Sequence, residues 1–387
     1  MKKYLLNIFK LKEKYLYLSI ILSFLVIACY HLNSGFYMSP DSNKFSRWAN
    51  DLIELNFNFY DFYFTDKSIN ERISPFFFTI PIFITALCKV IFGSEWQNAF
   101  LLFNLILVFF SMLIFARILL IIEVRTLLIF LSLPLIMISV DLLTWPRYIL
   151  SEMNYVFLVI LSIYIITKGL VENKFNYFLL FLITFFMLIT RPSSISVILV
   201  IIFFIIILKS QFKIKPKNSL AYLLILFTSV PLLFSLLYYF LEINFYENTK
   251  LNWWLLSKVK AGMIIHDRPE TWVDTPENFH DVVYIYFLRL INFFNPYAVN
   301  FSIIHIVLNS IQTFLIFLSL IFWSLFGGHA KYQDKLFFFV ILLSFSVASF
   351  HSFTLIDYDW RYRFPIILPL IMLFPLSLEM ILKKYIK

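Results

Sequence analysis

Charged side chains beside long apolar runs are the residues of this chain whose types and spacing allow chemistry. Asp41 follows the first apolar run, in the sequence Ser39-Pro40-Asp41-Ser42, and Glu152 opens a later run. Arg361 and Arg363 flank Tyr362 directly before the last run. A carboxylate can take a proton from a hydroxyl group, and a guanidinium group suits planar recognition of phosphate oxygens. These residue types therefore allow acid–base chemistry and favour anion binding at the two arginines.

Each of these residues also has an ordinary structural explanation. Asp41 stands where the N-cap of a helix is expected, a common position for Asp. Glu152 precedes a run of 15 uncharged residues, and a charged side chain at a helix end can reach out to the membrane interface. An acid so close to hydrocarbon is nevertheless costly and usually functional. Arg361 and Arg363 can serve as interfacial anchors or as an anion site, so both explanations stay open.

Composition indicates what must position these side chains. The chain is 61% hydrophobic and 14% charged, whereas a soluble domain carries about 25% charged residues. The net charge of +9 is spread over short basic runs between apolar stretches, which is the pattern that membrane topology requires. We therefore expect a multi-pass membrane protein in lipid, and no nucleic-acid partner.

A membrane-spanning helix needs roughly 20 apolar residues, and the sequence offers eleven candidate stretches. They are residues 15–33, 73–92, 96–116, 126–143, 153–170, 175–190, 193–208, 218–241, 299–326, 336–356 and 364–382. The first follows basic residues but has no small-residue cleavage pattern, so we interpret it as an uncleaved helix and not a signal peptide.

Charge parity tests this count. Four basic segments, at residues 2–14, 209–217, 331–335 and 383–387, are expected on the cytoplasmic side. An even number of crossings must separate each pair, yet seven stretches precede Lys209. We predict that 73–92 does not cross, because it contains Pro75 and Pro81 and is short. The alternative is that 126–143 is the stretch that does not cross.

The predicted fold is an all-α bundle of about ten (10–11) spans, a single domain over residues 1–387, with both termini cytoplasmic. A first outer loop at 34–95 holds the non-crossing apolar helix, and a long outer loop covers 244–298. Residues 141–152 and 357–363 complete the outer side. Phe45, Trp48 and Leu52 recur at helical spacing, which predicts an amphipathic helix lying in the interface.

In their order along the chain, these features resemble the GT-C superfamily of integral-membrane glycosyltransferases, within it the protein O-mannosyltransferases and lipid A aminoarabinose transferases. The first loop has Asp41, and a Pro-started apolar segment runs from Ser74-Pro75 to Phe92-Gly93. A span ending in Ala116-Arg117 follows, then Arg147-Tyr148 with Ser151-Glu152, and finally Arg361-Tyr362-Arg363-Phe364-Pro365.

The resemblance implies transfer of a hexosyl or pentosyl group from a polyprenyl-phosphate donor to a lipid, glycan or protein hydroxyl, outside the inner (plasma) membrane. Asp41 would be the base, and Glu152 the acid that orients a substrate. Arg361, Tyr362 and Arg363 would bind the phosphate, with Arg72, Arg147 and Arg191 as further candidates.

The sequence departs from the family at two places. Ser42 stands where a second acid often follows the first-loop Asp, and the residues before Pro75 read Glu71-Arg72-Ile73-Ser74. No metal-ligand set is predicted, and a divalent ion stays open as a cofactor.

Two other classes compete with this interpretation. A polysaccharide polymerase or O-antigen ligase also has ten to twelve spans and a long outer loop, but would place its essential arginines mainly in the late loops. A transporter or flippase tends to show internal repeats and mid-membrane charges. Here we find no convincing repeat, and the charges cluster at the ends of spans.

Overall fold

The computed structural model describes residues 12–64, 75–209, 279–297, 301–328, 330–353 and 360–386. The described residues form helices joined by short links, and no strand is assigned among them beyond one isolated bridge between Tyr37 and Tyr148. The predicted all-α class is therefore confirmed for this part of the chain.

The helices of the first half are α2 (Glu13–Ser34), α3 (Pro40–Glu54), α4 (Phe59–Phe64), α6 (Thr79–Phe92), α7 (Trp96–Ile121), α8 (Thr126–Met137), α9 (Val140–Thr144), α10 (Glu152–Glu172), α11 (Tyr177–Leu188) and α12 (Ser194–Lys209). Those of the second half are α15 (Phe279–Phe294), α16 (Ile303–Phe326), α17 (Lys331–Phe353) and α18 (Phe364–Ile386). Short 3-10 turns are η1 (Gly93–Glu95), η2 (Trp145–Arg147) and η5 (Trp360–Arg363).

The long helices have the lengths and surfaces of membrane spans. Among the described residues, six helical segments are long and apolar enough to cross a bilayer, or up to seven when the bent pair α8 and α9 is counted as one span. Large apolar side chains such as Leu22, Phe181 and Phe314 are exposed, a surface that water disfavours and lipid accepts. The chain is thus a helical membrane protein. The shorter α11 and α12 are also apolar, whereas 218–241 lies outside the described residues, so the count of ten stays a prediction.

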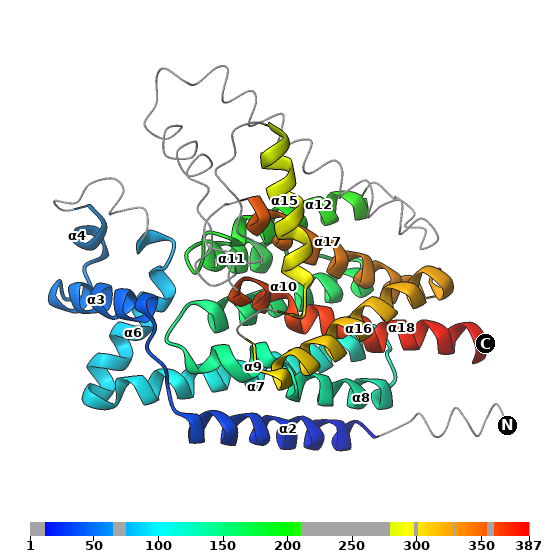
Figure 1. The fold of residues 1–387 in the computed structure, drawn as a ribbon, viewed down its shortest axis with the longest axis horizontal. Coiled ribbons are helices and arrows are strands. Elements are labelled where there is room, and N and C mark those ends of the chain that lie inside the picture. Colours follow the sequence, from blue (N-terminus) through cyan, green and yellow to red (C-terminus); the bar gives the residue numbers. More distant parts are fainter. Residues whose placement is uncertain are drawn as a thin grey trace.

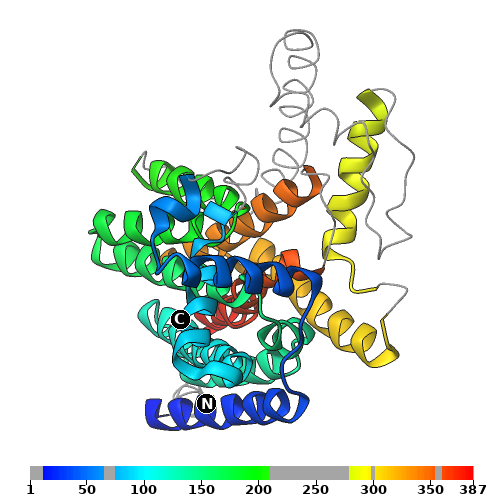
Figure 2. The same ribbon diagram turned by 90° about the vertical axis from the view of Figure 1, so that its left-hand side faces the viewer.

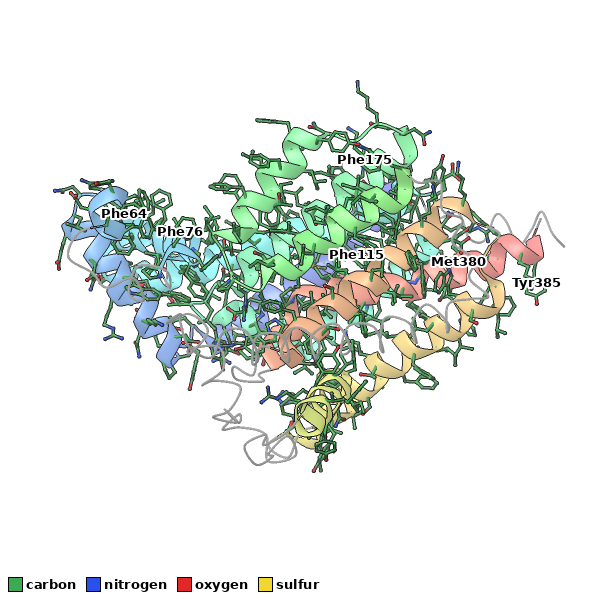
Figure 3. The ribbon with its side chains drawn as sticks, turned by 90° about the horizontal axis from the view of Figure 1, so that it is seen from above. Phe64, Phe76, Phe115, Phe175, Met380 and Tyr385 are labelled. Atoms are coloured by element: carbon green, nitrogen blue, oxygen red, sulfur yellow. The ribbon has the colours of Figure 1, made fainter. Side chains whose placement is uncertain are left out.

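The central helices of the bundle are α10, α17 and α18, which are mostly buried, while α2 and α16 leave most of their surface uncovered. Figure 1 shows that α2 begins and α18 ends at the same end of the bundle. Figure 3 places Phe64 and Phe76 at the opposite end from Tyr385, with the buried Phe115 and Met380 between. The end that carries α3, α4 and α6 is called the α3 end below.

The stretch 126–143, predicted as one span, is broken. Helix α8 contains Pro134 and ends at Met137, and after Ile138 and Ser139 the chain continues as α9 at an angle of 54°. The break turns α9 and η2 across the α3 end, where they supply Asp141 and Arg147 to the candidate site.

Helices α6 and α7, joined by η1, form a continuous helical run of 43 residues, Thr79–Ile121. A straight helix of that length would measure about 65 Å, roughly twice the ~30 Å of hydrocarbon in a bilayer. Gly93 adopts a φ of 53° at the junction, a left-handed conformation that glycine tolerates. In Figure 1, α6 turns away from the direction of α7 at the α3 end. This bend agrees with the prediction that 73–92 does not cross, although crossing itself stays a prediction.

Helix α3 is the predicted amphipathic helix, but its apolar stripe is covered by protein. Phe45, Ala49 and Leu52 are buried with Ile82 and Ala86 of α6. Lys89 of α6 further fastens α3, because its Nζ donates to the Ser46 carbonyl at 2.9 Å and to Asn50 Oδ1 at 2.6 Å. The expectation that this stripe lies in the lipid interface was therefore wrong: sequence periodicity shows an apolar face but not which surface covers it.

Helix α6, rather than α3, carries the exposed apolar surface of this unit. Val90, Ile91 and Phe92 in its last turn are all more than half exposed. Farther along, Leu102 of α7 is exposed as well. Figure 2, which views the molecule from the α3 end, shows α3 lying across that end. The exposed apolar surface at this end thus lies on α6 and α7 and not on the apolar stripe of α3.

The predicted long outer loop is described only at its C-terminal side. Residues 244–278 and 298 lie outside the described residues, but Phe279–Phe294 forms α15 and packs along α17. Tyr286 OH donates to Ser349 Oγ at 3.1 Å. This part of the loop is thus a helix joined to the bundle.

Cysteine labelling tests the placement of α6. In a background with Cys29 and Cys88 replaced by Ala, we expect a cysteine at Ser94 to react with a membrane-impermeant maleimide in intact cells. A cysteine at Glu123 should react only after permeabilisation, since one crossing of α7 separates the two positions. Ser94 labelling that requires permeabilisation would show that α6 crosses.

Candidate functional site

Two linkers meet at the α3 end and fix the geometry of the site. The α2–α3 linker and the segment before α10 pair through the bridge between Tyr37 and Tyr148, and Tyr37 N–H donates to the Arg147 carbonyl at 2.9 Å. The Arg147 guanidinium donates to the Ser34 carbonyl at 3.0 Å. Gly35, with a φ of 68°, ends α2 at this point. These contacts bring the α2–α3 linker beside the start of α10.

Asp41 is not the N-cap of α3. Ser39 holds that position and forms a capping box with Ser42, while Pro40 occupies the first turn. A capping box satisfies two otherwise free backbone N–H groups. Ser39 and Ser42 therefore perform the capping role that the sequence suggested for Asp41. The Asp41 carboxylate is available for other contacts.

Arg361 joins the two acids predicted to be catalytic. Its Nη1 lies 2.5 Å from Asp41 Oδ2, and its Nε lies 3.9 Å from Glu152 Oε1. Arg191, from the turn between α11 and α12, donates from Nη1 to the same Glu152 oxygen at 2.6 Å. We call Asp41, Glu152, Arg191 and Arg361 the acid–arginine cluster.

Exposure rises through this cluster from one end to the other. The Glu152 and Arg191 side chains are 3% and 7% exposed, Arg361 is 18% exposed, and Asp41 is 45% exposed. Two acids face two guanidinium groups, so the formal charges cancel. Glu152 Oε2 is buried without a hydrogen-bond partner among the described residues. The cluster therefore offers an accessible carboxylate at its mouth and an unused acceptor in its interior.

Stacked aromatic rings pack against the acid–arginine cluster. His351 of α17 lies over Tyr362 with ring centroids 4.2 Å apart and planes 6° apart, and its ring is also parallel to that of Phe293 at 6.4 Å. The guanidinium carbons of Arg191 and Arg361 lie 5.2 Å and 5.4 Å from the centre of the Tyr362 ring. Such cation–π contacts hold a guanidinium group in place. Tyr362 thus contacts both arginines and positions them.

Arg363 belongs to a second, buried centre. Its Nε donates to Asp141 Oδ2 at 3.0 Å and its Nη2 donates to Asn309 Oδ1 at 3.1 Å. Trp145 Nε1 donates to the other Asp141 oxygen at 3.2 Å. Since Asp141 and Arg363 are 3% and 9% exposed, this pair joins α9 to the start of α18. Its geometry supports a structural role, while the predicted phosphate contact of Arg363 stays a prediction.

The structure thus brings together four of the predicted site residues, namely Asp41, Glu152, Arg191 and Arg361, with Tyr362 against them. Arg147 lies at the edge, bonded to the Ser34 carbonyl, and Arg72 lies outside the described residues. Sequence reasoning did not select His351 or Asp141 for the site. A lone histidine in an apolar stretch does not indicate a functional site. Asp141 lies in a segment that was predicted to be on the outer side, and this position did indicate a candidate.

No group of three or more His, Cys, Asp or Glu side chains is placed to hold a metal ion within the described part of the chain. The cluster combines two carboxylates with two guanidinium groups, and the guanidinium groups bind anions.

Comparison with known proteins finds no match: no family model, no curated protein and no solved structure is similar to the chain. Inference about function therefore starts from the geometry of the cluster.

The second centre can be tested through stability. Replacing Asp141 with Leu removes the carboxylate that pairs with the buried guanidinium group of Arg363. Removing one partner of a buried pair lowers the free energy of unfolding by about 3–5 kcal/mol. We expect Asp141→Leu to lower the melting temperature in detergent markedly, and Asp141→Leu/Arg363→Met to recover much of the loss. A single variant as stable as the parent protein would contradict the structural role of this pair.

Proposed function

We propose that this protein is an integral-membrane glycosyltransferase that acts on the extracytoplasmic face. Its donor is a hexose or pentose linked to polyprenyl phosphate, and its acceptor is a hydroxyl group of a cell-envelope molecule. The proposal agrees with the resemblance of the sequence to GT-C enzymes.

The observation that carries the proposal is the contact of Arg361 with both acids. Asp41, Glu152 and Arg361 come from three segments far apart in sequence, and they meet at one end of the bundle. An accessible carboxylate beside a guanidinium group is what transfer from a phosphate leaving group needs: one group takes a proton, and the other stabilises the departing negative charge.

In the proposed reaction, the acceptor oxygen attacks the anomeric carbon of the donor sugar. The bond between that carbon and the phosphate oxygen breaks, and polyprenyl phosphate departs with the bonding electrons. Asp41 takes the proton of the acceptor hydroxyl, and Arg361 binds the phosphate oxygens. The free Oε2 of Glu152 accepts a hydrogen bond from a sugar or acceptor hydroxyl and thereby orients it.

Charge balance adds a step to donor binding. The cluster is already neutral, so a phosphate diester brings an additional negative charge that competes with the carboxylates for Arg361. Glu152 is 3% exposed and keeps Arg191, whereas Asp41 is 45% exposed and can be solvated when released. The donor phosphate therefore displaces Asp41 from Arg361, and the released carboxylate becomes free to act as a base.

Transfer tests the role of Asp41. Asp41→Asn should lower the rate by about 10²–10⁴-fold, since the amide cannot accept the proton. The assay follows release of polyprenyl phosphate by protein in lipid nanodiscs, from a polyprenyl-phosphate sugar with a cell-envelope extract as acceptor. Glu95→Gln, which neutralises another exposed acid near the α3 end, should retain activity. Full activity of Asp41→Asn would show that Asp41 is not the base.

Binding tests the displacement step separately. Although it blocks transfer, Asp41→Asn should bind a short-chain polyprenyl phosphate several-fold more tightly than the parent protein, because the competing carboxylate is gone. Arg361→Ala should lose this binding, and Glu95→Gln should leave the dissociation constant unchanged. Equal affinities of Asp41→Asn and parent would refute the displacement step without touching the role of Asp41 as base.

A further inference from the structure

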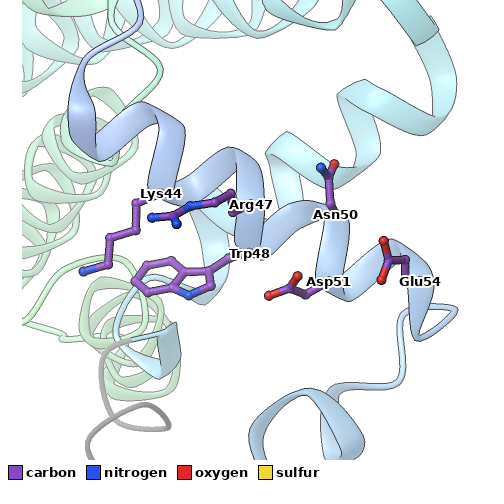
Figure 4. A pocket seen from close by; sticks show the side chains of 6 residues that line it. All are labelled: Lys44, Arg47, Trp48, Asn50, Asp51 and Glu54. Carbon is purple, nitrogen blue, oxygen red and sulfur yellow. The ribbon is translucent and has the colours of Figure 1, made fainter.

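Helix α3 carries an open hollow of about 400 Å³ (Figure 4). Six side chains of this one helix line it: Lys44, Arg47, Trp48, Asn50, Asp51 and Glu54. Lys44 lies three residues after Asp41, so the hollow begins one helical turn from the proposed base. The proposed reaction makes no use of this hollow.

An aromatic ring is fixed within the hollow. Trp48 stacks on Phe78 with ring centroids 6.5 Å apart and planes 23° apart, and it also contacts Phe45 at 5.9 Å. The Lys44 ammonium group lies 4.7 Å from the centre of the indole ring. Trp48 is only partly buried, so the ring is held by neighbours while part of its surface remains available. Figure 4 shows Lys44, Arg47 and Asp51 arranged around it.

The charges around the ring balance and are unused. Lys44 and Arg47 are matched by Asp51 and Glu54, so the hollow has no formal net charge. Among the described residues, Arg47, Asp51 and Glu54 form no side-chain hydrogen bond or ion pair. A strongly charged ligand, whether an anion or a cation, would be repelled by this lining as much as it is attracted. The hollow therefore suits a neutral ligand that both donates and accepts hydrogen bonds.

The lining of the hollow differs in character from the exposed surface of α6. The apolar stripe of α3 packs on α6, and it is α6 that exposes Val90, Ile91 and Phe92. Of the lining residues, Asn50 accepts a hydrogen bond from Lys89 of α6 and Trp48 stacks on Phe78, whereas Lys44, Arg47 and Glu54 are exposed. An acyl chain is a poor match for these charged side chains, and an anionic headgroup patch is a poor match for a lining without net charge.

We propose that this hollow binds the saccharide part of the acceptor, an inference that rests on the proposed transferase function. Sugars present an apolar C–H face and a rim of hydroxyl groups that are both donors and acceptors. The indole ring of Trp48 packs against the C–H face, Asp51 and Glu54 accept hydrogen bonds from hydroxyls, and Lys44 and Arg47 donate to them. The acceptor class is thereby narrowed to a glycan or glycolipid.

The geometry also gives the acceptor a direction. Asp41, Lys44, Trp48 and Asp51 follow one another at spacings of three or four residues and so lie along one side of α3. A glycan seated on Trp48 extends along the helix towards Asp41, where its terminal hydroxyl loses its proton. The hollow lies at the small end of the ~300–1,000 Å³ range of ligand sites, which fits a short piece of glycan.

Saturation-transfer NMR on the full chain in nanodiscs tests this site without requiring turnover. The probes are the methyl glycosides of glucose, galactose, mannose and N-acetylglucosamine. We expect saturation to reach the ring C–H protons of at least one probe, with binding about ten-fold weaker in Trp48→Ala because the stacking contact is lost. Trp48→Tyr, which keeps an aromatic face, should restore most of the signal.

Further variants make the outcome decisive. Trp96→Phe changes a tryptophan outside the hollow and should bind as the parent does, whereas Asp51→Asn/Glu54→Gln keeps the ring but should weaken binding. Absence of saturation transfer to all four probes, or an undiminished signal in Trp48→Ala, would overturn the proposal. Asp41→Asn should still bind the glycosides. Loss of transfer in Asp41→Asn with no glycoside binding in the parent would therefore refute the saccharide site alone.

Discussion

The burial of Glu152 at the start of α10 is the constraint on which the α3 end depends. A carboxylate that is 3% exposed in an apolar bundle is costly unless it is paired and hydrogen-bonded. Its partners, Arg191 and Arg361, come from the α11–α12 turn and from the turn before α18. Pairing them with Glu152 therefore requires three segments, separated by many residues, to meet at one point. Tyr362 contacts both guanidinium groups, and His351 stacks on Tyr362.

The sequence Arg361-Tyr362-Arg363 contributes one arginine to each of two charge centres, and the two centres differ in exposure. Arg363 is enclosed with Asp141 and Asn309, whereas Arg361 contacts an acid that is nearly half exposed. The enclosed pair fixes α9 against α18, and the open pair can exchange partners. Because only Tyr362 separates the two arginines, the enclosed centre holds the backbone of the open one. A side chain that can exchange its partner while its backbone is held rigidly is well suited to binding an anion.

The sequence was sufficient for the helices whose apolar runs are long, since hydrophobic length sets the bounds of α2, α10 and α16 closely. It also indicated that acids and arginines would gather at the ends of helices. It could not assign partners: several outer acids and arginines can pair in many ways, and only tertiary packing selects Asp141 for Arg363. Nor could it show that Ser39 would cap α3, or that α6 would cover Phe45 and Leu52. His351 gave no sequence signal, because its value lies in a ring stack between α15 and η5.

The arrangement of charge bears on the class of chemistry. A transporter needs its polar residues along a path through the bilayer, yet the acid–arginine cluster and the second centre both lie at the α3 end. At that end, α6 exposes apolar side chains while α3 presents a polar, charge-balanced side beyond it. A donor with a lipid tail can approach from the first surface, and an acceptor rich in hydroxyl groups can approach from the second. Asp41 stands where the two routes meet, and its contact with Arg361 links the arrival of one substrate to the activation of the other. This boundary, more than any single residue, favours the proposed transfer between a lipid-linked donor and a water-exposed acceptor.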